Sequence, residues 1–210
     1  MKKYLVIGNP IDHSLSPKLH NFWIKNNKLD AVYEKKKLNK NELADLIFEI
    51  KKKKIQGINV TVPFKKAVIP YLDGLSLESE NTQSVNTIYL NNNKVIGHNT
   101  DIEGFERSIE AFKSDIINKK VLILGAGGVV PSIIFALNKM KVSEIIISNR
   151  TRSNAENLKS LFKKIKIVDW GKFPMFDMII NATSIGLKDD EKIYIDISKI
   201  GKNKIFYDVI

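Results

Sequence analysis

The chain has 210 residues, which is enough for one large domain or two small ones. Hydrophobic residues make up 43% of it and charged residues 27%, close to ordinary globular proportions, so a disordered or collagen-like chain is excluded. No apolar run approaches the ~20 residues that span a bilayer, and the N-terminal apolar stretch is too short for a secretory signal. We therefore expect a cytoplasmic protein. The absence of cysteine agrees with a reducing compartment and excludes disulfides.

The formal net charge of +11 raises the question of nucleic-acid binding. The excess is almost entirely lysine, since the only arginines are Arg107, Arg150 and Arg152. The densest basic run, residues 51–54, has no aromatic residue among its lysines to stack on bases. The three histidines do not have the spacing of metal ligands. We therefore expect no nucleic acid, no membrane and no metal as partners.

The first half of the chain is predicted to mix short strands and helices. Residues 4–8 form an apolar run typical of a buried strand. Residues 17–27 favour a helix, with Ser16 as its N-cap and Pro17 at the first helical position. The other elements expected here are a strand at 31–36, a helix at 41–51, a strand at 55–62, a short helix at 64–72, and a hairpin of residues 85–90 and 94–97.

The second half alternates strands and helices more regularly, after a helix predicted at 101–112. Helices at 131–139 and 153–162 separate the predicted strands, which are 121–124, 144–148, 166–168, 178–181 and 205–209. This βαβαβ succession predicts a parallel, doubly wound sheet with right-handed crossovers. The fold class is therefore α/β, with one domain at 1–101 and a second at 102–210.

A glycine loop at residues 125–128 follows a predicted strand and precedes a predicted helix. Gly125 permits a tight turn, and Gly127 lets the backbone approach a pyrophosphate, whose charge the helix N-terminus favours. The third glycine of the usual pattern is replaced by Val130, so the fingerprint is incomplete. The pattern favours a dinucleotide site, and the alternative is a glycine-rich turn that binds no nucleotide.

The end of the next strand indicates which dinucleotide is bound. An NAD site carries an acidic residue here for the ribose 2′-hydroxyl, whereas this segment reads Asn149, Arg150, Thr151 and Arg152. Two guanidinium groups and a hydroxyl suit a 2′-phosphate, which favours NADP. The alternative is that both arginines are simply exposed on a loop.

Polar residues also recur at the predicted strand ends of the first half, in the segments HSLSP, NVTVPFK, VNT and GHNTD. Alternate positions in NVTVPFK share one face of a strand, and Lys65 lies just beyond its end. Taken alone, Ser16 and Asp101 are equally consistent with helix caps.

Together, the segments SLSP, NVTVPFK, VNT, GHNTDIEG, GAGG, NRTR, NATSIGL and YDV resemble the shikimate dehydrogenase family, in family order and over essentially all of the chain. The resemblance implies an N-terminal substrate domain and a Rossmann domain that binds NADP. It implies reversible reduction of 3-dehydroshikimate to shikimate with NADPH, on the route to chorismate and aromatic amino acids. Lys65 and Asp101 are then the catalytic pair.

The resemblance also implies binding roles for further residues. The substrate residues are Ser14, Ser16, Asn59, Thr61, Lys65, Asn86 and Asp101. The cofactor residues are Gly125, Ala126, Gly127, Gly128, Val129, Asn149, Arg150, Thr151, Arg152, Thr183, Ser184 and Val209. The small-molecule substrate would be bound by a monomer or a homodimer.

Family members continue past the YDV strand into a C-terminal helix that packs on the first domain and contributes a glutamine to the substrate. This sequence stops at Ile210, so we expect a Rossmann domain with an incomplete C-terminal end. On that expectation the chain binds NADP but turns over shikimate poorly. The alternatives are a quinate/shikimate dehydrogenase that uses NAD and a nucleotide-binding relative without catalysis.

Overall fold

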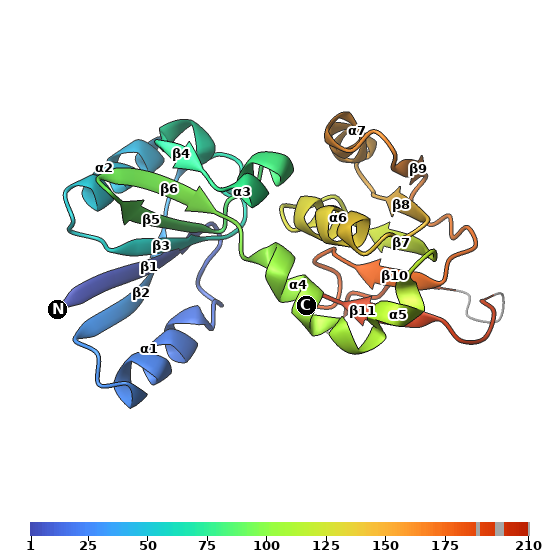
Figure 1. Ribbon diagram of the computed structural model, residues 1–210, viewed down its shortest axis with the longest axis horizontal. Coiled ribbons are helices and arrows are strands. Elements are labelled where there is room, and N and C mark those ends of the chain that lie inside the picture. The colour runs from blue at the N-terminus through green and yellow to red at the C-terminus, as the bar shows by residue number, and fades with distance from the viewer. Residues whose placement is uncertain (188–189, 196–199, 210) are drawn as a thin grey trace. The chain divides into compact units, whose positions relative to one another are not determined.

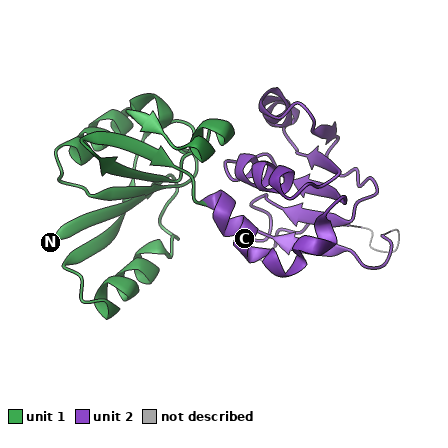
Figure 2. Cartoon of the chain, viewed as in Figure 1, with its two compact units in different colours: residues 1–100 green, residues 101–210 purple. Residues whose placement is uncertain are grey.

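The computed structural model describes residues 1–187, 190–195 and 200–209. The chain divides into two compact units, Met1–Thr100 (unit 1) and Asp101–Ile210 (unit 2), coloured separately in Figure 2. Each unit has its own sheet and its own hydrophobic core.

Unit 1 is built on a six-stranded sheet of order β2-β1-β3-β5-β6-β4 (Figure 1). Its strands are β1 (Lys2–Gly8), β2 (Ala31–Lys37), β3 (Gly57–Val60), β4 (Gly74–Leu75), β5 (Thr87–Asn91) and β6 (Lys94–His98). Strand β1 pairs in parallel with both β2 and β3, whereas β3, β5 and β6 pair antiparallel. The predicted hairpin is confirmed, because Asn92 and Asn93 take the left-handed backbone conformation that a tight turn between β5 and β6 needs.

The helices of unit 1 are α1 (Ser16–Asn26), α2 (Leu43–Lys51) and α3 (Leu77–Thr82), with single 3₁₀ turns at Lys40–Glu42 and Ile69–Tyr71. The helical stripe predicted within 41–51 is confirmed, since α2 buries Leu43, Leu46, Ile47 and Ile50. In contrast, no residue of α1 is fully buried, and this helix lies beside the edge strand β2.

Two predictions for unit 1 were wrong, and one helix was missed. Ser16 is not an N-cap: it is the first residue of α1, Leu15 holds the cap position, and the Ser16 N–H donates to Ser14 Oγ at 3.4 Å. Residues 64–72 form turns rather than a helix, because Pro70 has no N–H to donate to a helical hydrogen bond. Helix α3 was not anticipated, although Ser76 caps it by accepting the Ser79 N–H at 3.3 Å.

Unit 2 contains the predicted parallel sheet, of order β11-β10-β7-β8-β9 (Figure 1). Its strands are β7 (Lys120–Leu124), β8 (Glu144–Ser148), β9 (Lys166–Val168), β10 (Met178–Asn181) and β11 (Ile205–Asp208). The helices α6 (Val130–Lys139) and α7 (Arg152–Leu161) connect successive strands, as predicted. Ile210, the final residue of the apolar C-terminal stretch, lies outside the described residues.

The predicted helix at 101–112 is interrupted. Helix α4 (Asp101–Ser108) ends where the Ser108 hydroxyl donates to the Phe105 carbonyl, and a 3₁₀ turn (Glu110–Phe112) and the short α5 (Lys113–Ile116) follow. Serine hydroxyls compete in this way for the carbonyls of the preceding turn.

The central strands of unit 2 are covered on both faces. In β7, Val121 and Ile123 belong to one buried cluster, whereas Leu122 and Leu124 belong to another. This alternation explains why the strand reads as a continuous apolar run in the sequence. The sheet is a rigid base for the loops that leave its carboxyl edge, where ligands bind in folds of this kind.

Candidate active site

Lys65 follows a tight turn at the carboxyl end of β3. The turn lies against β1, because the Thr61 N–H donates to the Ile7 carbonyl at 2.9 Å and the Phe64 N–H closes back on the Thr61 carbonyl at 2.9 Å. Phe64 is buried and anchors the turn. A side chain at Gly8 would come within 2.7 Å of the Thr61 methyl, so glycine is needed for this close approach. The turn leaves Lys65 half-buried directly after the anchor.

The backbone of Lys65 is fixed to the segment that carries Asn86. The Val85 N–H donates to the Lys65 carbonyl at 2.8 Å, and the Val60 N–H donates to the Asn86 carbonyl at 2.8 Å. The backbones of Thr61, Lys65 and Asn86 are therefore close together at one edge of the sheet.

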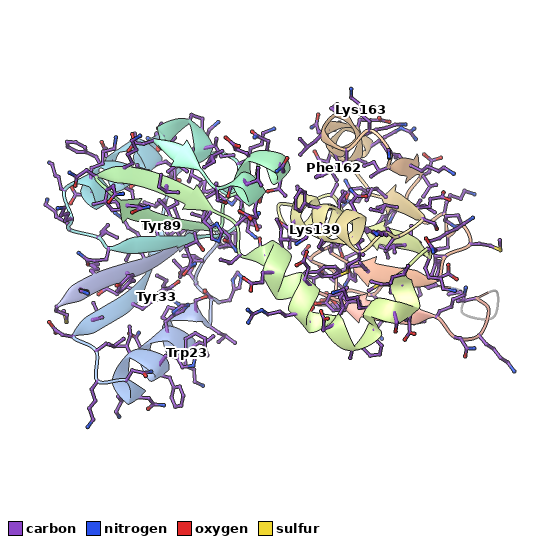
Figure 3. All side chains as sticks on the ribbon, viewed as in Figure 1. Trp23, Tyr33, Tyr89, Lys139, Phe162 and Lys163 are labelled. Carbon is purple, nitrogen blue, oxygen red and sulfur yellow. The ribbon has the colours of Figure 1, made fainter. Side chains whose placement is uncertain are left out.

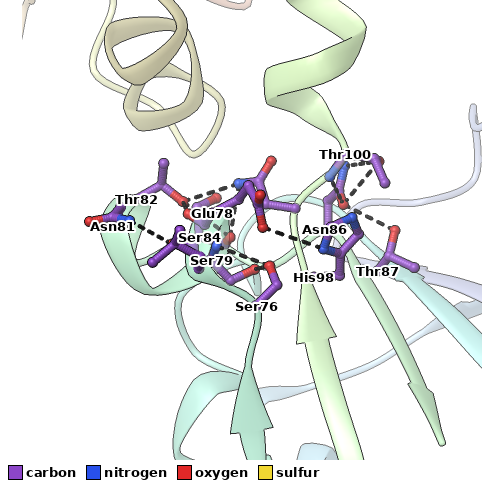
Figure 4. Close-up of polar contacts among 12 residues, drawn as sticks. Ser76, Glu78, Ser79, Asn81, Thr82, Ser84, Asn86, Thr87, His98 and Thr100 are labelled. Carbon is purple, nitrogen blue, oxygen red and sulfur yellow. Dashed lines mark hydrogen bonds and ion pairs between the residues drawn. The ribbon is translucent and has the colours of Figure 1, made fainter. Parts of the chain in front are cut away.

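The side chain of Asn86 forms hydrogen bonds with Thr100, the residue before Asp101 (Figure 4). Its Oδ1 accepts the Thr100 N–H at 3.0 Å, and its Nδ2 donates to Thr100 Oγ1 at 2.8 Å. Thr87 Oγ1 donates to the same Oδ1 at 3.0 Å. Because Thr100 leads directly into α4, this contact fixes the point at which the chain reaches Asp101.

Helix α3 and the residues after it also form hydrogen bonds with the segment that contains Thr100, through its neighbour Asn99 (Figure 4). The buried Asn99 donates through Nδ2 to the Ser84 carbonyl at 2.9 Å and to Thr82 Oγ1 at 3.2 Å. Thr82 Oγ1 in turn donates to the Glu78 carbonyl at 2.6 Å. Sequence reasoning missed this support, although Ser76 followed by the acidic Glu78 and Glu80 gives a signal for a capped helix.

Both the oxygen and the nitrogen of the Asn59 side-chain amide form hydrogen bonds. Its Oδ1 accepts the Tyr33 hydroxyl at 2.7 Å, and its Nδ2 donates to Thr87 Oγ1 at 3.2 Å and to the Asn86 carbonyl at 3.3 Å. Burial raises the pKa of the Tyr33 phenol to about 12, so the hydroxyl remains a donor at ordinary pH. Tyr33 was missed at the sequence level, where it is only one aromatic residue in a predicted strand.

Ser14 and Ser16 lie at the start of α1, and both are half-buried. The helix is fastened to β2 through Asn21, whose side chain accepts the Tyr33 N–H at 3.0 Å and donates to the Tyr33 carbonyl at 2.8 Å. His20 stacks on the Tyr33 ring with centroids 4.1 Å apart, and burial lowers the pKa of the His20 imidazole. Tyr33 thus contacts both α1 and the Asn59 amide.

In unit 2, the glycine loop leaves the carboxyl end of β7 and leads into α6. Gly125 has φ +110°, and a Cβ there would lie 2.6 Å from the Ala182 carbonyl oxygen, so only glycine fits. A Cβ at Gly127 would meet nothing within 4 Å, which leaves open space above the loop. Ala126, Gly128 and Val129 complete the turn, and Val130 begins the helix.

Thr183 and Val209 lie at the same edge of this sheet. The Ala182 N–H donates to the Leu124 carbonyl at 2.8 Å, and the Thr183 N–H donates to Asn181 Oδ1 at 3.1 Å. The Val209 N–H donates to the Asn181 carbonyl at 3.1 Å, and Ser184 is exposed. The ends of β7, β10 and β11 therefore bring these predicted cofactor residues together.

The segment 149–152 follows β8, whose last carbonyl, at Ser148, accepts the Gly125 N–H at 2.8 Å. Asn149 Nδ2 donates to the Thr151 carbonyl at 2.7 Å and shapes the loop. Arg150 is exposed. Arg152 is also exposed, but it forms two ion pairs: its Nη1 donates to Asp169 Oδ1 at 2.7 Å, and its Nε lies 3.4 Å from Glu156 Oε1.

No helix in the described part of the chain is long and apolar enough to cross a bilayer. Among the same residues, no group of three or more His, Cys, Asp or Glu side chains is arranged to hold a metal ion.

Family models match both halves of the chain. Residues 6–88 match the shikimate dehydrogenase substrate binding domain, and residues 108–187 match shikimate / quinate 5-dehydrogenase. The chain belongs to the shikimate dehydrogenase family. The resemblance seen in the sequence motifs is therefore confirmed, and so is the expected α/β fold.

Individual relatives support the same family over the full chain. The NADP(+) shikimate dehydrogenase of Pelagibacter ubique is 60% identical over 209 residues, covering 100% of this chain and 79% of the relative. The crystal structure of shikimate dehydrogenase from Aquifex aeolicus has a TM-score of 0.88 at 35% identity and covers 100% of this chain and 79% of that one. A shikimate dehydrogenase solved in complex with NADP+ has a TM-score of 0.89 at 30% identity, covering 100% and 77%.

Proposed function

We propose that this chain reduces 3-dehydroshikimate reversibly to shikimate with NADPH, as a cytoplasmic enzyme of chorismate and aromatic amino acid biosynthesis. The observation that carries the proposal is the 60% identity to an NADP(+) shikimate dehydrogenase along the whole chain. The glycine loop and the polar strand ends described above agree with it. In this proposal, residues 1–101 bind the substrate and residues 102–210 bind NADP.

The substrate is a polyhydroxylated ring acid, which suits a pocket of neutral hydrogen-bonding groups. We assign its binding to Ser14, Ser16, Asn59, Thr61, Lys65, Asn86 and Asp101. Within unit 1, hydrogen bonds fix the backbones of Thr61, Lys65 and Asn86 relative to one another. Such preorganisation favours a rate increase, because the positioning groups need not be ordered during the reaction.

Lys65 acts as the general acid. As the ring ketone is reduced, negative charge develops on its oxygen, and the Lys65 ammonium both opposes that charge and gives the oxygen a proton. In the reverse direction the neutral amine takes the proton from the substrate hydroxyl. Asp101 accepts a hydrogen bond from a substrate hydroxyl and orients Lys65.

The residues of unit 2 suit NADP. The left-handed Gly125, the open space at Gly127 and the ten-residue helix α6 that follows are the features that a pyrophosphate needs. When bound, NADPH supplies the hydride for the carbonyl carbon. The residues that would hold it are Gly125, Ala126, Gly127, Gly128, Val129, Asn149, Arg150, Thr151, Arg152, Thr183, Ser184 and Val209.

The test is a set of matched turnover reactions with the purified chain. Shikimate and quinate are each supplied with NADP+ or NAD+, and formation of reduced nicotinamide is followed together with mass-spectrometric detection of the dehydro product, so that slow turnover is also recorded. We expect shikimate with NADP+ to be the fastest pair and Lys65→Ala to slow its turnover by ~10²–10⁴. Preference for quinate and NAD+, or no product with any pair, would overturn the proposal. A monomer and a homodimer are both compatible with it.

A further inference from the structure

Tyr33 joins two parts of unit 1 that the proposed function assigns to the substrate. Its ring and backbone hold α1, which begins at Ser16, through His20 and Asn21. Its hydroxyl reaches Asn59 on β3, although β1 lies between β2 and β3 in the sheet. The register explains this reach: Tyr33 pairs with Tyr4 and Asn59 pairs with Val6, so all four side chains lie on one face. Tyr33 is 4% exposed, and this fixes the direction of its hydroxyl.

From the Tyr33 hydroxyl, hydrogen bonds run in one direction as far as Asn86 Oδ1, and the Thr100 N–H donates to that same oxygen from the other side. Tyr33 donates to Asn59 Oδ1, and Asn59 Nδ2 donates to Thr87 Oγ1. Thr87 donates to Asn86 Oδ1, which also accepts the Thr100 N–H. Along the three bonds from Tyr33 to Asn86, each group is polarised by the one before it, so these bonds strengthen one another. The link to Thr100 is positional, because Asn86 Oδ1 must stay in place to accept the Thr100 N–H.

The first bond also sets the orientation of the Asn59 amide. With Oδ1 turned to the Tyr33 hydroxyl, Nδ2 faces the Asn86 carbonyl at 3.3 Å and Thr87 Oγ1 at 3.2 Å. Without the phenol hydroxyl, Oδ1 loses the Tyr33 bond and the amide is held only through the two longer bonds of Nδ2. A rotated amide would then set its oxygen against the Asn86 carbonyl oxygen, where two acceptors repel.

We infer that Tyr33 is a positioning residue for the reaction: its hydroxyl orients Asn59 and, through Thr87 and Asn86, holds Thr100, the residue that precedes Asp101 in the chain. Tyr33 touches none of the proposed reacting groups itself. Its effect on turnover rests on the proposed function, whereas its effect on Thr100 depends only on the hydrogen bonds described here.

The test compares Tyr33→Phe with Tyr89→Phe in the full chain. Tyr33 on β2 and Tyr89 on β5 are labelled in Figure 3, and both rings line one cavity of about 640 Å³. Each variant loses one hydroxyl and keeps its ring. Because Thr100 is exposed, protection of its amide against hydrogen exchange depends on its bond to Asn86 Oδ1. We expect Tyr33→Phe to speed Thr100 amide exchange, measured by NMR, at least ~5-fold, and Tyr89→Phe to leave it within twofold.

A second variant separates positioning from general packing. Thr87→Val removes the middle hydroxyl of the chain at nearly constant volume, and it should speed Thr100 exchange as Tyr33→Phe does. The double variant should add little to either single change, because both cut the same path. Additive effects, or a Thr100 amide unchanged in Tyr33→Phe, would overturn the inference.

Steady-state kinetics of shikimate oxidation test whether this positioning affects the reaction. We expect Tyr33→Phe to lower kcat for shikimate oxidation ~5- to 20-fold and to leave KM for NADP+ unchanged. If the unmodified chain makes no product, the proposed function fails, while the exchange measurements still decide the role of Tyr33. If exchange speeds up and kcat remains within twofold in an active enzyme, the positioning role is wrong.

Discussion

The Arg152 guanidinium donates to the carboxylate of Asp169, with Nη1 and Oδ1 2.7 Å apart. This pair links the first residue of α7 to the segment after β9, at the position where the proposed NADP site would meet the 2′-phosphate. Both side chains are largely exposed, and an exposed ion pair contributes only ~0.2–1 kcal/mol to stability. The pair has a larger effect on the proposed binding of NADP, because the negative Asp169 carboxylate repels a phosphate that approaches Arg152 and competes with it for the guanidinium.

Asp169→Asn should therefore tighten NADP+ binding while leaving the fold intact. Removing the negative charge frees the guanidinium for the phosphate, and we expect the Kd for NADP+ to fall ~2- to 5-fold, in line with the small energies of exposed charge pairs. Titration calorimetry measures it, with NAD+ as the ligand that should not respond. Asp115→Asn on α5 makes the same charge change away from the strand ends. Weaker NADP+ binding in Asp169→Asn would mean that the carboxylate orients Arg152 rather than competing for it.

Arg150→Asp should shift the preference from NADP+ toward NAD+. The change turns a charge-assisted contact with the 2′-phosphate into a repulsion, and a carboxylate here can accept the ribose 2′-hydroxyl. We expect KM for NADP+ to rise at least ~10-fold, with a smaller change for NAD+. Lys164→Asp, at an exposed lysine after α7, is the control for net charge. Unchanged KM values for both cofactors would remove Arg150 from the site.

Lys65→Ala should lower kcat by ~10²–10⁴, the usual range for losing a general acid. KM for shikimate should change much less, because the lost interaction is made mainly in the transition state. Steady-state kinetics measures both constants, and Lys66→Ala, at the exposed neighbouring lysine, should be close to the unmodified enzyme. If kcat stayed within a few-fold, Lys65 would be a binding residue instead.

The two glycines of the β7–α6 loop should respond differently to alanine. Gly125→Ala forces a side chain into a left-handed conformation and to within 2.6 Å of the Ala182 oxygen, so we expect a loss of ~1–3 kcal/mol in unfolding free energy. Gly127→Ala meets no protein atom and should keep the melting temperature while weakening NADP+ binding. Thermal denaturation and cofactor titration separate the two effects. Equal losses of stability would contradict this account of the loop.

The buried Tyr33 phenol should make stability depend on pH in the alkaline range. Its pKa is raised to about 12 in the fold, whereas an unfolded tyrosine titrates near 10. Between these values the folded state retains a proton that the unfolded state has lost, so stability is full below pH 10 and falls as pH rises toward 12. Urea midpoints measured across this range should fall less steeply in Tyr33→Phe, which lacks only this phenol hydroxyl. Parallel curves for the two proteins would show that Tyr33 does not cause this dependence.

Local sequence determined much of unit 2. Strands such as β7 and β8 are buried on both faces, so each appears as a short apolar run, and such a run can be recognised without knowing its neighbours. The glycine loop could also be predicted, because its glycine spacing and its place between a strand and a helix are local features of the sequence. The helical stripe of α2 is also a local pattern. Even so, Pro70 and Ser108 show that one residue can end a helix that periodicity alone would continue.

Only the tertiary structure decided which polar side chains meet. Tyr33 reaches Asn59 because β1 lies between their strands and the register sets both on one face, and neither fact can be read from residues 26 positions apart. In the same way, Asp169 reaches Arg152 because β9 pairs beside β8. A hydrogen bond or ion pair needs its two groups within about 3 Å, and strand order and register bring them there. Strand order in turn follows from burying the apolar surface of the whole unit, which no single segment specifies.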